Sequence, residues 1–343
     1  MVKSGVPQGS VLGPLLFIIY INDLPNQISH SNIYTFADDT KLVSKIRNVQ
    51  DTRSLQKDIE KIIAWTERNN MELNSSKFEL VTHELLQNSS KVLLDQLPFS
   101  QDYTLYKTAP DVIISPSCYV RDLGVYIDKN MDWNYHRTLI VQNAKRVSGW
   151  CLSVFHTREK TTMLTLLKSL IRPKLEFCCE LWHPDLARET NKLERVQRSF
   201  TYKIAGMKHM NYWERLEELN LESLQRRREK IIVTHVWKIK NSAYPNSVNL
   251  QFKEHKRSGC IKAVIKPLPK APLKFQTKFD ESFEVKGARL WNTLPAPLTR
   301  ATDLVTFKSL LNNFLLTIPD KPPIPGYPFS NKNSLSDITT TFV

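Results

Sequence analysis

Glycine and well-spaced cysteine are scarce in this chain, and their scarcity excludes several kinds of site. Only 9 of the 343 residues are glycine, which argues against a long glycine-rich loop around a nucleotide. The chain has 5 cysteines, none in C-x-x-C spacing: Cys118, Cys151, Cys178, Cys179 and Cys260. This odd, scattered set suits free thiols in a reducing compartment. The 8 histidines form no ligand cluster typical of zinc.

No apolar run approaches the length needed to span a bilayer. The run from Val11 to Ile21 follows Lys3, as in a secretory signal, but it contains Gly13-Pro14 and no small-residue cleavage pattern follows it. We therefore predict a buried helix there. The same reasoning predicts an intracellular protein, in the nucleus or the cytoplasm, that is not secreted and has no membrane partner.

Charge is distributed unevenly along the chain. Residues 1–134 hold 13 Lys and Arg against 16 Asp and Glu, whereas residues 135–240 hold 21 against 11 and residues 241–343 hold 14 against 7. A basic surface attracts polyanions such as nucleic acid. Many intracellular proteins are simply basic, so the charge supports a nucleic-acid partner only together with the motifs below.

Hydrophobic periodicity predicts an α+β fold in which the strands lie in the first third. The predicted elements are a helix over 10–23, a hairpin over 32–45, a helix over 51–70 capped by Asp51, a strand over 78–82 and a strand pair over 119–128. Residues 84–117 are expected to be irregular.

From Asn134 onward the pattern predicts a helical bundle. Its apolar stripes are expected to include one that Pro173 stops, one that ends near Gly206 and one that runs over 221–241. Residues 245–300, rich in proline and lysine, are expected to be mostly extended. A last helix is expected over 303–316, before a disordered tail from Pro319.

Two short motifs near the start carry possible chemistry. In the first, Gly5, Gln8, Gly9 and Ser10 precede the apolar run, and the glycines permit a close approach by a ligand. By itself this is a turn before a buried helix. In the second, Phe36-Ala37 precedes the adjacent carboxylates Asp38 and Asp39. Adjacent carboxylates repel each other, and a hard divalent cation relieves that repulsion. By itself this is an exposed turn.

In this order and spacing the two motifs resemble motifs B and C of the reverse transcriptase palm. The similarity is closest to non-LTR retrotransposon polymerases of the jockey and CR1 kind, through Gly5 to Phe17, Tyr20 to Pro25 and Phe36 to Leu42. Leu73 to Lys77 resembles motif D, although Phe78 stands where the family often has cysteine. Weaker blocks continue to about residue 316.

The resemblance implies a partial polymerase palm over 1–130, a helical, thumb-like basic region over 131–241, a C-terminal region over 242–318 and a tail over 319–343. It implies that Asp38 and Asp39 bind Mg²⁺ and that Lys77 stands near the leaving phosphates. Gly5, Gln8, Gly9, Ser10 and Phe36 would border the template and the nascent base pair. The implied partners are an RNA template, a DNA primer or duplex, and deoxynucleoside triphosphates.

The basic run Arg226, Arg227, Arg228 with Lys230 is a further candidate, for contacts to the nucleic-acid backbone. The alternative for some of these residues is the charged face of an exposed helix.

Two functional hypotheses remain open. Family members place motif A, with the first metal-binding aspartate, and the fingers upstream of motif B, where this sequence begins. The chain is therefore either a piece of an RNA-directed DNA polymerase or a catalytically inactive remnant that acts at most as a basic nucleic-acid-binding protein. In both cases we expect the 343 residues alone to be inactive as a polymerase.

Overall fold

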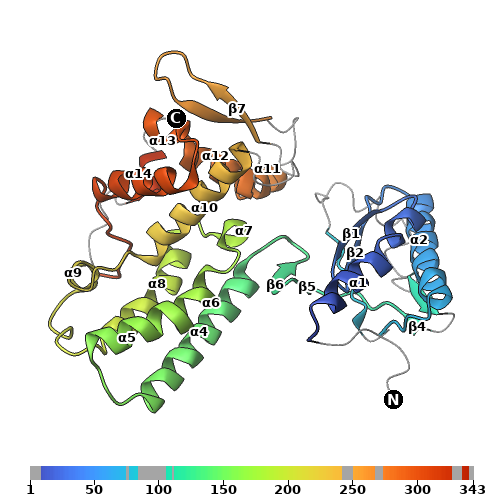
Figure 1. Ribbon diagram of the computed structural model, residues 1–343, viewed down its shortest axis with the longest axis horizontal. Helices are drawn as coiled ribbons and strands as arrows, with labels where there is room; N and C mark the ends of the chain where they lie inside the picture. Colours follow the sequence, from blue (N-terminus) through green and yellow to red (C-terminus); the bar gives the residue numbers. More distant parts are fainter. Residues whose placement is uncertain are drawn as a thin grey trace. The chain divides into compact units, whose positions relative to one another are not determined.

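The computed structural model describes residues 9–74, 77–83, 106–109, 112–241, 250–266, 273–326 and 334–339. Two compact units make up the chain (Figure 1). Unit 1 contains residues 1–121 and 128–130, and unit 2 contains residues 122–127 and 131–343. The described residues combine helices with small antiparallel hairpins, which agrees with the predicted α+β class.

Unit 1 contains the predicted first hairpin between two helices. Its elements are α1 (Leu12–Ile21), a 3₁₀ turn (Leu24–Gln27), β1 (Asn32–Phe36), β2 (Asp39–Val43) and α2 (Val49–Arg68). The strands pair antiparallel from Asn32 opposite Val43 to Phe36 opposite Asp39. Both strands are rich in β-branched and aromatic residues, as strands prefer.

Helix α2 begins one turn earlier than predicted, because Asn48 rather than Asp51 caps it. The Asn48 side chain accepts a hydrogen bond from the Asp51 backbone N–H at 3.0 Å. Asp51 instead accepts from the Arg47 backbone N–H at 2.8 Å. An amide at the N-cap satisfies a helix-end donor as well as a carboxylate does. The end of the helix at Asn69 agrees with the prediction.

Two small hydrophobic clusters form the interior of unit 1. Their buried members are Ile21, Leu24 and Trp65 in one, and Ile59, Tyr106 and Ile114 in the other. A buried carboxylate ties α2 to the chain before β1: Asp58 accepts from the backbone N–H groups of Ser29, His30 and Ser31 at 3.2, 2.9 and 2.8 Å. Trp65 also donates to Asp23 at 3.1 Å.

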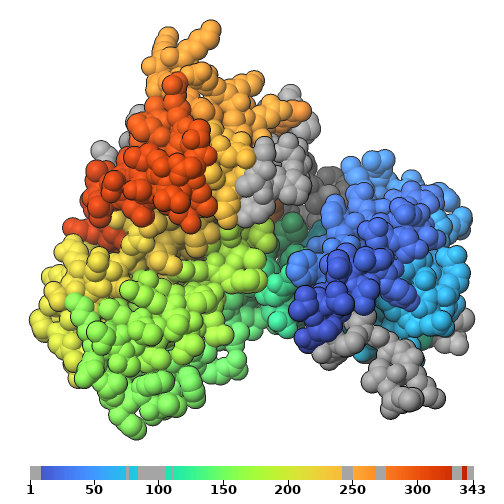
Figure 2. All heavy atoms as spheres, in the orientation of Figure 1, coloured from blue at the N-terminus to red at the C-terminus, as the bar shows by residue number. Residues whose placement is uncertain are grey.

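Helix α1 contradicts the prediction that the first apolar run is buried. Only Gly13 and Ile21 of its residues are buried, because only its C-terminal end packs with Leu24 and Trp65. Its exposed apolar side chains include Leu12, Leu15, Leu16, Ile18, Ile19 and Tyr20. Figure 2 shows α1 in dark blue on the surface of unit 1.

The remaining short strands differ in part from the prediction. No strand forms over 78–82, where Leu80 makes only an isolated bridge to Pro116. In the sequence between Leu80 and Pro116, which was predicted to be mostly irregular, β3 (Lys107–Ala109) pairs with β4 (Val112–Ile113). The pair predicted over 119–128 forms as β5 (Tyr119–Asp122) and β6 (Val125–Asp128), with Gly124 at φ 90° in its turn.

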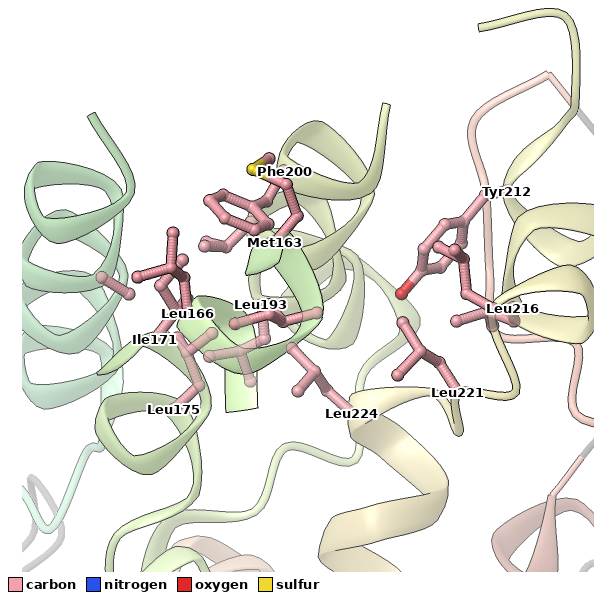
Figure 3. Close-up of a cluster of buried hydrophobic side chains, with 14 of the residues drawn as sticks. Met163, Leu166, Ile171, Leu175, Leu193, Phe200, Tyr212, Leu216, Leu221 and Leu224 are labelled. Carbon is pink, nitrogen blue, oxygen red and sulfur yellow. The ribbon is translucent and has the colours of Figure 1, made fainter. Parts of the chain in front are cut away.

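The first half of unit 2 is the predicted helical bundle. Its helices are α4 (Asn134–Val154), α5 (Lys160–Leu166), α6 (Arg172–Glu176), α7 (Cys179–Trp182), α8 (Ala187–Thr201), α9 (Tyr212–Glu218) and α10 (Leu224–Lys240). Figure 3 shows side chains from several of them meeting in one buried cluster, with Leu175, Leu193 and Phe200 fully enclosed.

Two predicted helix ends in this bundle are wrong. Pro173 does not stop its helix, because a π-helical turn (Leu167–Ile171) precedes it and Pro173 then lies in the first turn of α6. Proline is tolerated there, since a first-turn N–H has no partner within the helix. Helix α8 ends at Thr201 rather than near Gly206.

The C-terminal part of unit 2 is mainly helical, which corrects the prediction of an extended segment over 245–300. It contains β7 (Leu250–Glu254), β8 (Ile261–Ile265), α11 (Leu273–Asp280), α12 (Phe283–Asn292), α13 (Ala296–Arg300) and α14 (Leu304–Leu316). Asp303 caps α14, close to the predicted start of the last helix. These elements enclose a second buried cluster that includes Trp237, Trp291 and Phe307.

Part of the predicted disordered tail is folded. Helix α15 (Leu335–Thr339) packs near α10 and α12, and Leu335 is buried. The carboxylate of Glu229, on α10, accepts from the Leu335 backbone N–H at 3.1 Å and from the Ser336 hydroxyl. Earlier in the same segment, Asp320 accepts from the Ser223 backbone N–H at 2.8 Å and pairs with Arg226 at 3.6 Å.

Candidate active site

The β1–β2 hairpin places two carboxylates side by side in the chain at an exposed turn. Asp38 lies in the turn and Asp39 is the first residue of β2. Both are exposed, as is Phe36, the last residue of β1. Because the pair lies at the tip, a ligand can reach both carboxylates without rearrangement of the strands.

The turn between the strands has an unusual backbone. Ala37 has φ 51°, in the left-handed region that residues with a Cβ avoid. Such a conformation costs about 1–2 kcal/mol for an L-residue, and strained residues are concentrated at functional sites. The strain lies between Phe36 and the two carboxylates.

The carboxylate pair has no third ligand within the described residues. No group of three or more His, Cys, Asp or Glu side chains suitable for a metal occurs in that part of the chain. The pair therefore supplies oxygen ligands of the type that hard divalent ions prefer, but only two side chains of the larger set such ions take.

The first motif is described only in part. Gly5 and Gln8 lie outside the described residues. Gly9 has φ 83°, where a side chain would be strained, and nothing lies within 4 Å of the position a Cβ would occupy. The Ser10 hydroxyl accepts from the Gly13 backbone N–H at 3.0 Å and so closes the first turn of α1. Ser10 thus has a structural role at the start of this helix.

Lys77 is exposed in unit 1 and its backbone N–H donates to the Asn74 carbonyl at 3.0 Å. Within the described residues, no ion pair joins it to Asp38 or Asp39. The structure therefore neither brings the lysine to the carboxylates nor buries it away from solvent.

The basic run on α10 corrects one set of predicted phosphate contacts. The side chains of Arg226 and Arg228 are buried, at 7% and 0% exposure, so neither faces solvent in the folded unit. Arg226 pairs with Asp320, and burial lowers the pKa of Arg228 despite nearby Glu194. Arg226 thus joins α10 to Asp320, whereas the guanidinium nitrogens of Arg228 are buried without a hydrogen-bond partner among the described residues.

Arg227 and Lys230 remain half-buried and paired. Arg227 donates to both oxygens of Glu176, at 2.8 Å from Nη2, and these bonds raise its pKa. Lys230 donates to Glu222 at 2.8 Å. Their charges are therefore partly neutralised within the fold.

The sequence reading missed a different set of basic residues, on α4 and α8, which pack together. Helix α4 has no acidic residue among its 21. On α8 both glutamates are buried, whereas the exposed charged residues are all basic. The exposed cations of the two helices are Lys145, Arg146, Arg188, Lys192 and Arg195. The absence of acidic residues from 134–154 was a signal visible in the sequence.

Aromatic side chains accompany these cations. Trp150 on α4 is 54% exposed and Tyr202, just after α8, is 42% exposed. Exposed aromatic rings next to basic residues suit nucleic acid, because rings stack on bases while cations contact phosphates. Helices α4 to α8 lie in the green and yellow-green surface of Figure 2.

Comparison with known proteins identifies the class to which this site belongs. Residues 1–147 match the family described as reverse transcriptase (RNA-dependent DNA polymerase), and this match contains the hairpin with Asp38 and Asp39. The matched residues are less than half of the chain, and over them the chain is similar to the reverse transcriptase family. No solved structure matches the chain.

The relatives define the branch of the family. The chain is 27% identical over 214 residues to a probable RNA-directed DNA polymerase from transposon X-element of Drosophila melanogaster. It is 24% identical over 221 residues to the RNA-directed DNA polymerase from mobile element jockey of Drosophila funebris. Each alignment covers 60% of this chain and 22% of the relative. The predicted resemblance to non-LTR retrotransposon reverse transcriptases is confirmed.

The matched part of the chain spans 22% of the length of each of these two relatives, about a fifth. Within the described residues, none of the helices combines the length and the apolar character that crossing a membrane requires.

Proposed function

We propose that this chain contributes to RNA-directed DNA synthesis, with unit 1 as part of the polymerase palm and unit 2 as a nucleic-acid-binding thumb. The observation that carries the proposal is the exposed Asp38–Asp39 pair at the tip of a hairpin inside the matched reverse transcriptase segment. An RNA template, a DNA primer and deoxynucleoside triphosphates are the partners that such a polymerase uses.

The donor set fits a hard divalent ion, which we propose to be Mg²⁺, held by Asp38 and Asp39. When bound, such an ion stabilises the negative charge of phosphoryl transfer. The strained Ala37 turn keeps both carboxylates at the tip. Lys77 would neutralise phosphate charge. Gly5, Gln8, Gly9, Ser10 and Phe36 would border the template and the nascent base pair.

Two carboxylates are fewer than a two-metal centre needs, and no third one joins them within the described residues. We therefore expect the 343-residue chain to bind a divalent ion weakly and to extend no primer.

The first test measures Mn²⁺, a paramagnetic substitute for Mg²⁺, by the broadening of backbone amide signals. Broadening should centre on residues 36–40 and disappear in Asp38→Asn with Asp39→Asn. Glu67→Gln, an exposed carboxylate on α2, is the matched control and should leave it unchanged. Equal broadening in all three proteins would exclude the hairpin as the metal site. Mg²⁺-dependent primer extension that Asp38→Ala abolishes would show that the 343 residues suffice for catalysis.

The basic surface of α4 and α8 supports the second part of the proposal and also the alternative, a remnant that binds nucleic acid without catalysis. The exposed cations defined above would contact the backbone of an RNA–DNA duplex without reading its sequence. Each phosphate contact adds about 0.9 to the slope of log affinity against log salt.

The test is duplex binding at several salt concentrations. The double variant Arg188→Glu with Arg195→Glu should weaken binding and lower the salt slope by roughly 1–2. Lys253→Glu, an exposed lysine on β7, makes the same kind of charge change away from this surface. If Lys253→Glu weakens binding as much as the α8 variant, binding depends on net charge and the surface assignment is wrong.

A further inference from the structure

The residues that line a pocket in unit 2 include none from α4 or α8. The pocket has a volume of about 490 Å³ and is walled by α10, α14 and α7. Helices α10 and α14 pack against each other, as do α10 and α7 (Figure 1). Its volume lies in the range of small-molecule sites, roughly 300–1,000 Å³.

The lining contains both cations and carboxylates, and two of its cations are already paired: Arg227 with Glu176 and Lys230 with Glu222. Arg227, Lys230 and Lys238 come from α10 and Lys308 from α14, against the two carboxylates of Glu180 and Glu222. Both carboxylates have partners within the fold: Glu222 lies 2.8 Å from Lys230, and Glu180 lies 3.5 Å from the His235 ring. Burial acts to raise the pKa of Glu180, but His235 and Lys238 outweigh it, so its pKa lies below the ordinary value.

The walls of the pocket are held by the core. Phe307 on α14 stacks on Trp237 of α10 at 5.7 Å between ring centroids, and both are buried. The bidentate bond from Arg227 to Glu176 fixes that guanidinium against α6. Anchored walls lose little entropy when a ligand binds, so the site is preorganised.

The rest of the lining suits a ligand with an apolar part. Ile231 and Leu311 supply apolar surface, and Thr234 and Asn312 supply hydrogen-bonding groups. These two apolar side chains lie among lining residues that are otherwise polar or charged.

From this lining we propose that the pocket binds a phosphate-bearing ligand of nucleotide size. Lys308 and Lys238 contact the phosphates, while the base or sugar lies against Ile231 and Leu311. The ligand is either a free nucleotide or one nucleotide of a strand. The proposal depends neither on polymerase activity nor on the α4 and α8 surface.

The experiment titrates the full chain with a deoxynucleoside triphosphate, with inorganic phosphate and with a short single-stranded oligonucleotide. Calorimetry gives the affinity, and amide shifts on α10 and α14 locate the site. Lys308→Glu and the milder Lys308→Gln should weaken triphosphate binding about five- to tenfold, as expected for a lost charged contact. Lys308 is exposed, so neither variant disturbs the core.

Lys253→Glu is the matched charge control, and Arg188→Glu with Arg195→Glu separates this site from duplex binding; both should leave triphosphate affinity unchanged. Displacement of the triphosphate by the oligonucleotide would assign the site to a strand, and its failure would assign it to a free nucleotide. Absence of α10 and α14 shifts at millimolar triphosphate, or an equal loss in Lys253→Glu, would overturn the proposal.

Discussion

Unit 1 and unit 2 differ most in how much apolar surface each buries. Among the described residues of unit 1, the two clusters have three buried members each, and most of α1 remains exposed. Among those of unit 2, two clusters contain 20 and 18 buried residues. The motifs that identify the family thus lie in the part with the smaller interior, whereas the larger interior belongs to the part with weaker motifs.

The residues suited to ligand contact and the residues that stabilise the fold therefore lie mostly in different units. Residues that contact a ligand need exposure, and Asp38, Asp39 and Phe36 have it. Burial of apolar area stabilises a fold by about 25 cal/mol per Å², and unit 2 buries more of it. We therefore expect core changes in unit 2 to cost most and surface changes on α1 to cost least.

The largest effect should come from the unit 2 core. Trp291→Ala removes a fully buried ring stacked on Phe307, and it should lower the free energy of unfolding of unit 2 by about 3–5 kcal/mol. Trp150→Ala, at an exposed tryptophan of the same unit, should cost less than about 1 kcal/mol. Denaturant unfolding followed by circular dichroism measures both. Similar costs at the two positions would contradict the core assignment.

The next effect is a pH dependence of unit 2. Burial, then the charge of Arg137, lowers the pKa of His136 from 6.5 to about 4. As the pH falls, the histidine binds a proton in the unfolded state before it does so in the folded state. The free energy of unfolding of unit 2 should therefore decrease by up to about 3 kcal/mol between pH 6.5 and pH 4, and should not change above that range.

Unfolding at a series of pH values measures this loss. His136→Gln should make the profile less steep without abolishing the slope, because burial also lowers the pKa of His183 in the same unit, whereas His156→Gln, at an exposed histidine, should keep the wild-type slope. A slope that His136→Gln leaves unchanged would assign the dependence to other groups.

A smaller effect concerns the single buried carboxylate of α2. Asp58→Asn weakens the bonds to the backbone of Ser29, His30 and Ser31, and should destabilise unit 1 by about 1–3 kcal/mol. Burial acts to raise the pKa of Asp58, but these bonds outweigh it and lower the pKa. Its contribution is therefore present above pH 3.8 and is lost as the pH falls through the lowered pKa. Glu60→Gln, exposed on the same helix, should change stability by less than about 0.5 kcal/mol; hydrogen exchange of α2 compares the two.

The smallest effect on stability should come from the exposed face of α1. Ile19→Ser, at a side chain 64% exposed, should change stability by about 0.5 kcal/mol or less and reduce self-association. Ile21→Ser, at the buried end of the same helix, should cost about 2 kcal/mol or more. Thermal unfolding and light scattering separate the two effects. If Ile19→Ser destabilises as strongly as Ile21→Ser, the exposed face is packed in solution.

Local patterns predicted the first hairpin, the strand pair over 119–128, the helical bundle and the last helix over 303–316, because short-range periodicity and turn chemistry determine them. Local patterns did not predict which side chains are buried where burial depends on residues that are distant in the sequence. The exposure of α1 depends on what packs over it, and the burial of Arg226 depends on residues about 90 positions further on, Ile318 and Asp320.

The candidate site shows the same division. The adjacency of Asp38 and Asp39 at a turn followed from the sequence alone. The basic surface on α4 and α8 did not, since it depends on which face of each helix the core conceals. Glu189 and Glu194 are buried and so do not themselves lie on that surface, although Glu189 pairs with Lys192 at 2.7 Å.

The hydrogen bonds between Glu229 and the segment around Ser336 affect the order of folding. The two residues are 107 positions apart in the chain. At synthesis rates of about 5–20 residues per second, roughly 5–20 seconds pass between the synthesis of α10 and the synthesis of the segment around Ser336. During that interval Glu229 lacks its partners at Leu335 and Ser336, and Gln225, four residues earlier on α10, is its remaining partner. A ribosome that slows over residues 230–336 would lengthen the exposure of α10 to chaperones and proteases.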